Sequence, residues 1–382
     1  MRAMDYRGPY RIRLEDKPMP GIEHPRDAIV RVTRTCICGS DLHLYHGLVP
    51  DTRVGTTFGH EFTGVVEEVG AEVHNLKPGD QVLVPFNIAC GQCHFCQQGL
   101  FGNCHESNPM ATAVAGIFGY SHTAGGYHGG QAEYVRVPYA DVGPTIIPDW
   151  MDLDDAVLLT DIVPTGYQAA EMAGIKPGDT AVVFGAGPVG IIAARCCWLF
   201  GAGRVIVFDH YDYRLEFVRN WAPAEAYNFK EVGDVVTFMK KTTDGLGADV
   251  AIDAVGAEAS GNTLHSIFGK RLKMEAGSPI ALHWAINSVK KGGIVSIVGV
   301  YGPTGNMIPI GNVVNKGLTL RANQASVKRL LPRLIEHVRE GHLKPSDLIT
   351  HKVPLEEISD AYHIFSAKLD GCIKPVLVPG RA

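Results

Sequence analysis

The sequence predicts an α/β protein in which a β-rich domain is split around a central domain with a parallel sheet. From residue 26 to about 160, apolar runs of four to eight residues rich in Val, Ile and Thr are bounded by Gly, Pro and Asp, which is typical of short strands. Near residue 160 the pattern changes to all-apolar strands that alternate with helical segments. This alternation indicates a parallel sheet covered by helices on both faces.

Chain length and segment order set the expected domain boundaries. A chain of 382 residues with 46% hydrophobic residues is long enough for about two domains. Residues 180–209 predict a strand, a glycine turn, a helix and a second strand. Beyond residue 325, a segment with helical spacing precedes a last strand near residues 372–379. We therefore expect one domain from residues 1–160 and 326–382 and a second from residues 161–325.

Composition excludes several classes of partner. The net charge of −5 and the pI near 6.3 give no reason to expect nucleic acid, which usually requires a basic face. No run of 18 uncharged apolar residues occurs, so we expect no membrane contact. The first residues lack the apolar core of a signal peptide, and we expect a soluble, cytoplasmic protein.

The glycine turn carries the strongest local motif, GAGPVG at residues 185–190. It follows a predicted strand directly and opens a helix, the context in which G-x-G-x-x-G binds a dinucleotide; without that context a tight turn would be the better interpretation. Asp209 ends the next strand, where a carboxylate can bond a ribose hydroxyl and repel a 2′-phosphate, so NAD is favoured over NADP. The expected turn contacts are Gly185, Gly187, Pro188, Val189 and Gly190.

A cluster of four cysteines predicts a metal site. The spacing is C-x2-C-x2-C-x7-C, and in a reducing compartment metal explains such crowding better than disulfides do. Four thiolates leave no coordination position open, which is typical of structural zinc. An iron–sulfur cluster is the alternative, although the ferredoxin motif continues with a cysteine after three residues and then proline. The four residues are Cys90, Cys93, Cys96 and Cys104.

Two further segments, CICGSDLH at residues 36–43 and FGHEFTG at residues 58–64, are ambiguous alone. A buried thiol, a core histidine and solvated acids would explain them. Together with the four-cysteine loop and TDIVPTG ahead of GAGPVG, they resemble the zinc-dependent medium-chain alcohol dehydrogenases along essentially the whole chain. The resemblance implies a GroES-like β-rich catalytic domain and a Rossmann domain with a doubly wound parallel sheet.

The resemblance also implies a catalytic zinc site. Cys38 and His60 match two ligands, and Asp161 stands where many members have cysteine; a similar D-I-x-P-T-G occurs in glutathione-independent formaldehyde dehydrogenases. Carboxylate plus thiolate still balances the charge of Zn²⁺. Asp41 matches the residue that orients the zinc histidine, and Glu61 a carboxylate that either supports the ligands from behind or exchanges at the metal.

By the same resemblance, Ser40 takes the alcohol proton and passes it through the cofactor ribose to His43, which releases it to solvent. His46 is expected at the surface. Four cofactor contacts are implied: nicotinamide packing, a ribose contact, a carboxamide contact and a pyrophosphate cation, at Thr165, Arg214, Val298 and Lys374 respectively.

The implied function is hydride transfer between NAD and an alcohol or an aldehyde hydrate or adduct, with two zinc ions per chain in a homodimer or homotetramer. Two alternatives stay open: a formaldehyde dehydrogenase or dismutase that retains NAD tightly, and a zinc- and dinucleotide-binding protein without turnover. The segment between Ala257 and Gly292 is longer than one connecting helix requires. We expect it to fold over the cofactor, with Phe268, Ile280, Leu282 and Trp284 packing.

Overall fold

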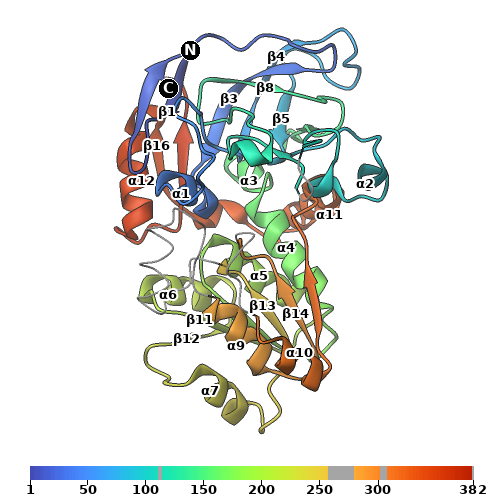
Figure 1. The fold of residues 1–382 in the computed structure, drawn as a ribbon, viewed down its shortest axis with the longest axis vertical. Coiled ribbons are helices and arrows are strands. Elements are labelled where there is room, and N and C mark those ends of the chain that lie inside the picture. Colours follow the sequence, from blue (N-terminus) through green and yellow to red (C-terminus); the bar gives the residue numbers. More distant parts are fainter. Residues whose placement is uncertain (111–113, 257–278, 302–307, 381–382) are drawn as a thin grey trace. The chain divides into compact units, whose positions relative to one another are not determined.

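The computed structural model describes residues 1–110, 114–256, 279–301 and 308–380 (Figure 1). These residues form two compact units, one from Met1–Pro164 and Gln324–Ala382, the other from Thr165–Asn323. Asp161 lies in the first unit, near its boundary with the second. None of the helices described is both long and apolar enough to span a membrane.

Unit 1 is built on a sheet whose central pair positions the candidate metal ligands. Strand β3 (Ala28–Cys36) pairs antiparallel with β4 (Phe62–Val69), and Thr35 lies opposite Phe62. The end of β3 and the start of β4 therefore lie side by side. Buried residues of both strands, among them Val30, Val32 and Phe62, belong to one core cluster, so the register of the pair is well specified.

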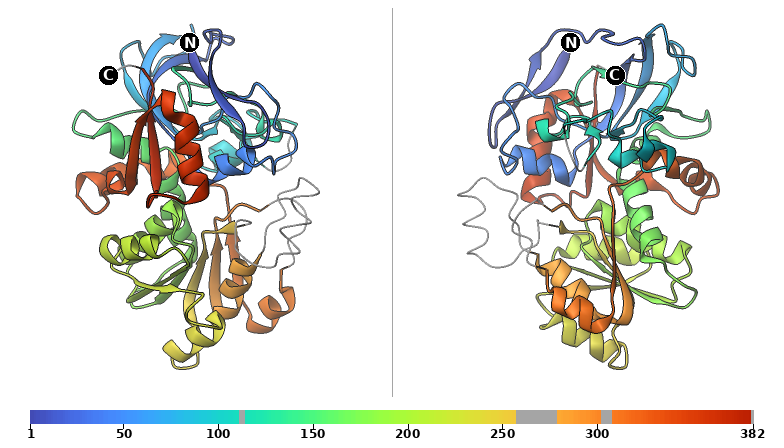
Figure 2. Two further views of the ribbon diagram at one scale, coloured as in Figure 1. Left: turned by 90° about the vertical axis from the view of Figure 1, so that its left-hand side faces the viewer. Right: turned by 45° about the vertical axis from the view of Figure 1, so that its right-hand side comes forward.

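The rest of the unit 1 sheet extends this pair on both sides. Its order is β16-β17-β3-β4-β5-β9, and β8 also pairs with β3. Helix α12 packs on β16 and β17 (Figure 2). The bounds are β5 (Gln81–Val84), β8 (Tyr134–Val137), β9 (Thr145–Ile146), β16 (Ile349–Pro354), β17 (Lys374–Val378) and α12 (Ile358–Ala367).

Smaller elements complete unit 1. They are the hairpin β1 (Arg2–Tyr6) and β2 (Ile12–Asp16), the pair β6 (Asn87–Ile88) and β7 (Gly116–Ile117), and the helices α1 (Gly39–Tyr45), α2 (His94–Gln97), α3 (Leu153–Leu158) and α11 (Val327–Arg339), with short 3₁₀ turns at Phe101–Asn103, His122–Ala124, Pro345–Leu348 and Leu355–Glu357. Helix α4 (Ile162–Ala173) begins in unit 1 directly after Asp161 and continues into unit 2.

Unit 2 contains a six-stranded parallel sheet in the order β12-β11-β10-β13-β14-β15. Helices α5 and α6 pack on β10, β11 and β12, while α9 and α10 pack on β13 and β14. The bounds are β10 (Thr180–Phe184), β11 (Arg204–Asp209), β12 (Glu225–Asn228), β13 (Ala248–Asp253), β14 (Val289–Ile297), β15 (Thr319–Ala322), α5 (Pro188–Leu199), α6 (Asp212–Trp221), α7 (Val235–Thr242), α9 (Ile280–Ser288) and α10 (Ile310–Lys316). This is the doubly wound sheet that the sequence predicts.

The apolar side chains expected to fold over the cofactor pack elsewhere, in the part of the segment after Ala257 that the structure describes. Leu282 lies in α9 and is buried in the core of unit 2 with residues of β10 and β11, and the ring of Trp284 lies 5.1 Å from that of Phe229. These apolar side chains therefore complete the sheet packing instead of forming a cover over a cofactor. Residues 257–278, including Phe268, lie outside the described residues.

Two glycines in the turn between β10 and α5 have different roles, one in packing and one in leaving space for a ligand. A Cβ at Gly190 would lie 1.9 Å from the carbonyl oxygen of Gly185, so this glycine allows the helix to approach the turn. At Gly187 the nearest atom is Nη1 of Arg214, at 3.8 Å, and the protein does not fill the space. Gly187 is also the N-cap of α5, where a helix start attracts anions. The turn therefore fits a dinucleotide phosphate.

We predict that Gly187→Ala leaves stability close to wild type but weakens NADH binding, because its Cβ occupies the space for a phosphate. Gly190→Ala should instead lower the unfolding temperature, because its Cβ meets backbone. Thermal unfolding and titration of NADH fluorescence measure the two effects. Unchanged NADH affinity in Gly187→Ala would contradict the assignment of this space to the cofactor.

Candidate metal and cofactor sites

Four side chains converge at the shared end of β3 and β4. Cys38 follows β3, His60 and Glu61 precede β4, and Asp161 precedes α4. Their candidate ligand atoms all lie within 4.8 Å of one another. Asp161 Oδ2 lies 3.7 Å from Cys38 Sγ and 3.2 Å from His60 Nε2. The structure thus brings together the three ligands that the sequence predicts, although Asp161 is more than 100 residues away in sequence.

These separations fit zinc. Ligand distances of about 2.3 Å for sulfur and 2.0–2.1 Å for nitrogen or oxygen place tetrahedral neighbours about 3.3–3.5 Å apart. Thiolate, imidazole and carboxylate are also a donor set that zinc accepts, and three protein ligands leave a position open. Burial raises the pKa of Cys38, so a cation would bind here by displacing a proton from the thiol.

Asp41 connects two of the three ligands. Its Oδ2 accepts a hydrogen bond of 2.9 Å from the Cys38 backbone N–H, and its Oδ1 lies 3.3 Å from His60 Nδ1. Burial opposes a charge on His60, but Asp41 and Asp161 outweigh it and hold the pKa of His60 well above its ordinary value. With Nδ1 facing Asp41, Nε2 is left to face the cluster. Asp41 is fully buried, which excludes the interpretation as a solvated surface acid.

Two residues that sequence reasoning missed hold Asp41 in turn. Gln131 Nε2 donates to Asp41 Oδ2 at 3.3 Å and to the Cys36 carbonyl at 3.0 Å, and Tyr362 donates to Gln131 Oε1 at 2.9 Å. Gln131 and Tyr362 are both fully buried. The tyrosine fixes which way the amide points, and the amide orients the carboxylate. Both residues lie far in sequence from the GHE motif and stand in no motif of their own, so nothing in the sequence indicated their role.

Glu61 pairs with Lys374 at the base of the cluster. Lys374 Nζ lies 2.6 Å and 2.8 Å from the two Glu61 oxygens and donates to the Ile37 carbonyl at 3.3 Å. Burial lowers the pKa of Lys374, but Glu61 outweighs it and the net shift is upward, so the ammonium stays charged. This corrects the expected pyrophosphate contact, because an ammonium with no exposed surface has none to offer a phosphate.

Of the predicted proton relay, Ser40 lies beside the cluster, but His43 does not lie at the surface. Ser40 Oγ lies 3.3 Å from His60 Nε2, beside the cluster. His43 lies three residues further along α1, but it is 4% exposed, so its ring is not at the surface as release to solvent requires. His46 is half-buried, so it lies partly at the surface, with Nε2 2.7 Å from Ser366 Oγ.

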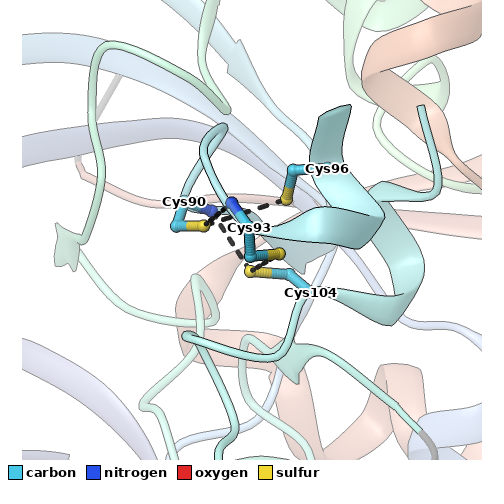
Figure 3. Close-up of side chains that lie close together, drawn as sticks. All are labelled: Cys90, Cys93, Cys96 and Cys104. Carbon is cyan, nitrogen blue, oxygen red and sulfur yellow. Dashed lines mark hydrogen bonds between the residues drawn. The ribbon is translucent and has the colours of Figure 1, made fainter. Parts of the chain in front are cut away.

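The four-cysteine loop forms a second cluster, shown in Figure 3. Cys90 Sγ lies 4.0 Å from Cys96 Sγ, and Cys93 Sγ lies 3.9 Å from Cys104 Sγ. Tetrahedral zinc with bonds of about 2.3 Å would place sulfurs about 3.8 Å apart. The Cys93 backbone N–H donates to Cys90 Sγ, and that of Cys90 to Cys104 Sγ, both at 3.3 Å. Such bonds stabilise thiolates, so the loop fits a closed four-thiolate site.

The predicted cofactor residues of unit 2 lie around the glycine turn and strand ends. Asp209 accepts backbone hydrogen bonds from Ala186 at 2.7 Å and His210 at 2.6 Å, so it also fixes the turn. Arg214 Nη1 lies 4.0 Å from Asp209 Oδ2. Val298 follows β14 and donates its backbone N–H to the Asp253 carbonyl at 3.0 Å, while Thr165 is half-buried in α4.

We predict that Gln131→Met loosens the cluster at Cys38 and His60 without affecting the four-cysteine loop. A freed Asp41 orients His60 less well, and loss of such a supporting contact typically lowers metal affinity about 10–100-fold. Zinc at the Cys38–His60 cluster should therefore be released faster to a chromogenic chelator, while zinc at the four-cysteine loop should be released at the wild-type rate. Tyr362→Phe should also accelerate this zinc release, but by a smaller factor. The matched Tyr127→Phe, which removes a 2.8 Å bond to the Ser107 carbonyl, should not. Equal release kinetics in all variants would contradict the role of Gln131.

Comparison with known proteins places the whole chain in one family. A family model described as "Alcohol dehydrogenase GroES-like domain" matches residues 24–149, and one described as "Zinc-binding dehydrogenase" matches residues 188–271. A protein of Bacillus subtilis (strain 168) named "Uncharacterized zinc-type alcohol dehydrogenase-like protein AdhB" is 43% identical over 381 residues, which cover 99% of this chain and 100% of the relative.

A solved structure and a second curated protein are also similar to this chain. The solved structure of alcohol dehydrogenase TADH from Thermus sp. ATN1 is similar with a TM-score of 0.86 and 32% identity, covering 100% of both chains. A glutathione-independent formaldehyde dehydrogenase of Pseudomonas aeruginosa is 38% identical over 274 residues, 68% of this chain and 67% of the relative. The chain therefore belongs to the zinc-dependent medium-chain alcohol dehydrogenases and is an oxidoreductase of that type.

Proposed function

We propose that the chain oxidises an alcohol, or a hydrated or adducted aldehyde, with NAD as hydride acceptor. The observation that carries the proposal is the convergence of Cys38, His60 and Asp161 at separations that fit zinc with an open fourth position. Zinc bound there would lower the pKa of an alcohol hydroxyl, so that the alkoxide forms near neutral pH. A second zinc, at the four cysteines, would hold the loop.

The chain's own residues have separate tasks in this proposal. Asp41 and Gln131 hold His60 in the orientation that presents Nε2. Ser40 Oγ, 3.3 Å from His60 Nε2, accepts the proton of the substrate hydroxyl as its own hydroxyl proton passes on toward His43. His43 shares a face of α1 with Ser40 at a spacing of three residues. Because His43 is 4% exposed, the proton reaches solvent only if the surroundings of its ring move.

Asp209 supports NAD over NADP. The carboxylate ends β11 beside the glycine turn, and a carboxylate has about four acceptor positions, so its backbone bonds leave capacity for a ribose hydroxyl. Arg214 beside it is the group that could tolerate a 2′-phosphate once the carboxylate is gone.

We predict that Asp209→Gly weakens NAD binding and narrows the ratio of kcat/KM for NAD over NADP. The substitution removes the carboxylate that repels the 2′-phosphate of NADP, while Arg214 remains to bind that phosphate. Initial rates with each cofactor at a fixed alcohol concentration measure the ratio. Faster turnover with NADP in the wild-type protein would contradict this assignment.

A narrower candidate is oxidation of formaldehyde without glutathione. Asp161 in the D-I-x-P-T-G motif favours it, as does the similarity to a relative that carries that name. A panel of primary and secondary alcohols, formaldehyde with and without glutathione, and larger aldehydes separates the candidates by the rate of NADH formation. Absence of turnover across the panel, with zinc and NAD both bound, would instead favour a binding protein without catalysis.

We predict that Asp161→Ala reduces zinc from two to about one per chain and lowers alcohol oxidation by at least about 100-fold, because Cys38 and His60 alone cannot neutralise or enclose the ion. The protein should stay folded and retain NADH binding. Elemental analysis and kinetics measure the two losses, and the exposed Asp149→Ala is the matched control. Two zinc ions and near-normal turnover in Asp161→Ala would show that another residue is the ligand, with Glu61 next to test.

A further inference from the structure

A third group of metal-ligating side chains lies outside both clusters, at the end of helix α11. His337, Glu340 and His342 place their candidate ligand atoms within 4.8 Å of one another. His342 Nδ1 lies 3.3 Å from His337 Nδ1 and 3.1 Å from Glu340 Oε2. We propose that these three residues form a surface site for a divalent transition-metal ion such as Zn²⁺.

The backbone explains why the two histidines meet. The N–H of Gly341 bonds to the Val338 carbonyl at 3.1 Å and that of His342 to the His337 carbonyl at 2.9 Å, which is the bonding pattern of a Schellman motif. Gly341 has φ of +71°, the left-handed conformation that the motif needs. In this motif the side chains at the positions of His337 and His342 come into contact, usually as an apolar pair. Here the pair is two imidazoles.

The residue that follows His342 is also held in place. Leu343 is 2% exposed, and its backbone N–H bonds to the same His337 carbonyl at 3.2 Å. The chain beyond the helix is therefore anchored, and His342 is held against His337 without a metal ion. A site arranged in advance loses less conformational entropy on binding.

Geometry and charge both fit a metal ion. Two nitrogens at about 2.0–2.1 Å from one tetrahedral ion lie about 3.3 Å apart, as the two Nδ1 atoms do. Two imidazoles and a carboxylate are ligands that zinc accepts, and the C-terminal end of a helix favours a cation. Glu340 contributes the negative charge. The competing explanation is a proton on His342 Nδ1 shared between Glu340 and His337, and a metal ion would replace that proton.

The test is calorimetric titration of Zn²⁺ into protein that already holds its other zinc. We expect one further equivalent to bind to the wild type and to raise its unfolding temperature, because the ion binds only the folded helix end. Both effects should be lost in His337→Ala and in His342→Ala and be weakened in Glu340→Gln. His74→Ala, which removes an exposed histidine elsewhere in unit 1, should retain both.

These variants lie outside the proposed catalytic residues, so alcohol oxidation without added Zn²⁺ should match wild type in each. No further equivalent in the wild type up to about 1 mM Zn²⁺ would overturn the proposal. The same additional binding in His337→Ala and His342→Ala would also overturn it, by placing the ion elsewhere. An unchanged affinity in Glu340→Gln would contradict a site with three ligands.

Discussion

The buried carboxylate of Asp41 is the contact on which the arrangement of the candidate metal site depends. One oxygen accepts the backbone N–H of Cys38 and the other faces Nδ1 of His60, so a single side chain fixes residues from both sides of the β3–β4 pair. A buried carboxylate requires partners, and Gln131, held by Tyr362, supplies one. Orientation of the ligands is therefore built into the protein before any metal binds.

Much of the fold and most of the ligands could be predicted from the sequence, because their signals are local. Short β-branched runs predicted the strands of unit 1, and the glycine turn after an apolar strand predicted the parallel sheet of unit 2. The four cysteines stand in a motif with fixed spacing, whereas Cys38 and His60 were ambiguous alone and were predicted by resemblance. Asp161 was likewise predicted by resemblance, since nothing near it in sequence shows that β3 and β4 bring Cys38 and His60 to the start of α4.

What could not be predicted depends on contacts between distant segments. Gln131 and Tyr362 are separated from Asp41 by 90 or more residues, and an isolated Gln or Tyr carries no pattern. Lys374 was expected at a phosphate by resemblance alone, whereas the structure buries it against Glu61, a contact between segments more than 300 residues apart. Trp284 and Leu282 were expected over a cofactor because the segment is long, but an apolar helix beside a parallel sheet is more stable packed on that sheet.

A closed site of four thiolates and an open site of mixed ligands differ in their number of sulfur ligands, and X-ray absorption at the zinc edge measures that number most directly. The two clusters contain five cysteines, four in the loop and Cys38. With two zinc ions per chain, we predict an average of 5/2 sulfur ligands per zinc, with nitrogen and oxygen completing the coordination shells. An average of four sulfurs per zinc, with one ion per chain, would contradict it, because no zinc would then be held by Cys38, His60 and Asp161.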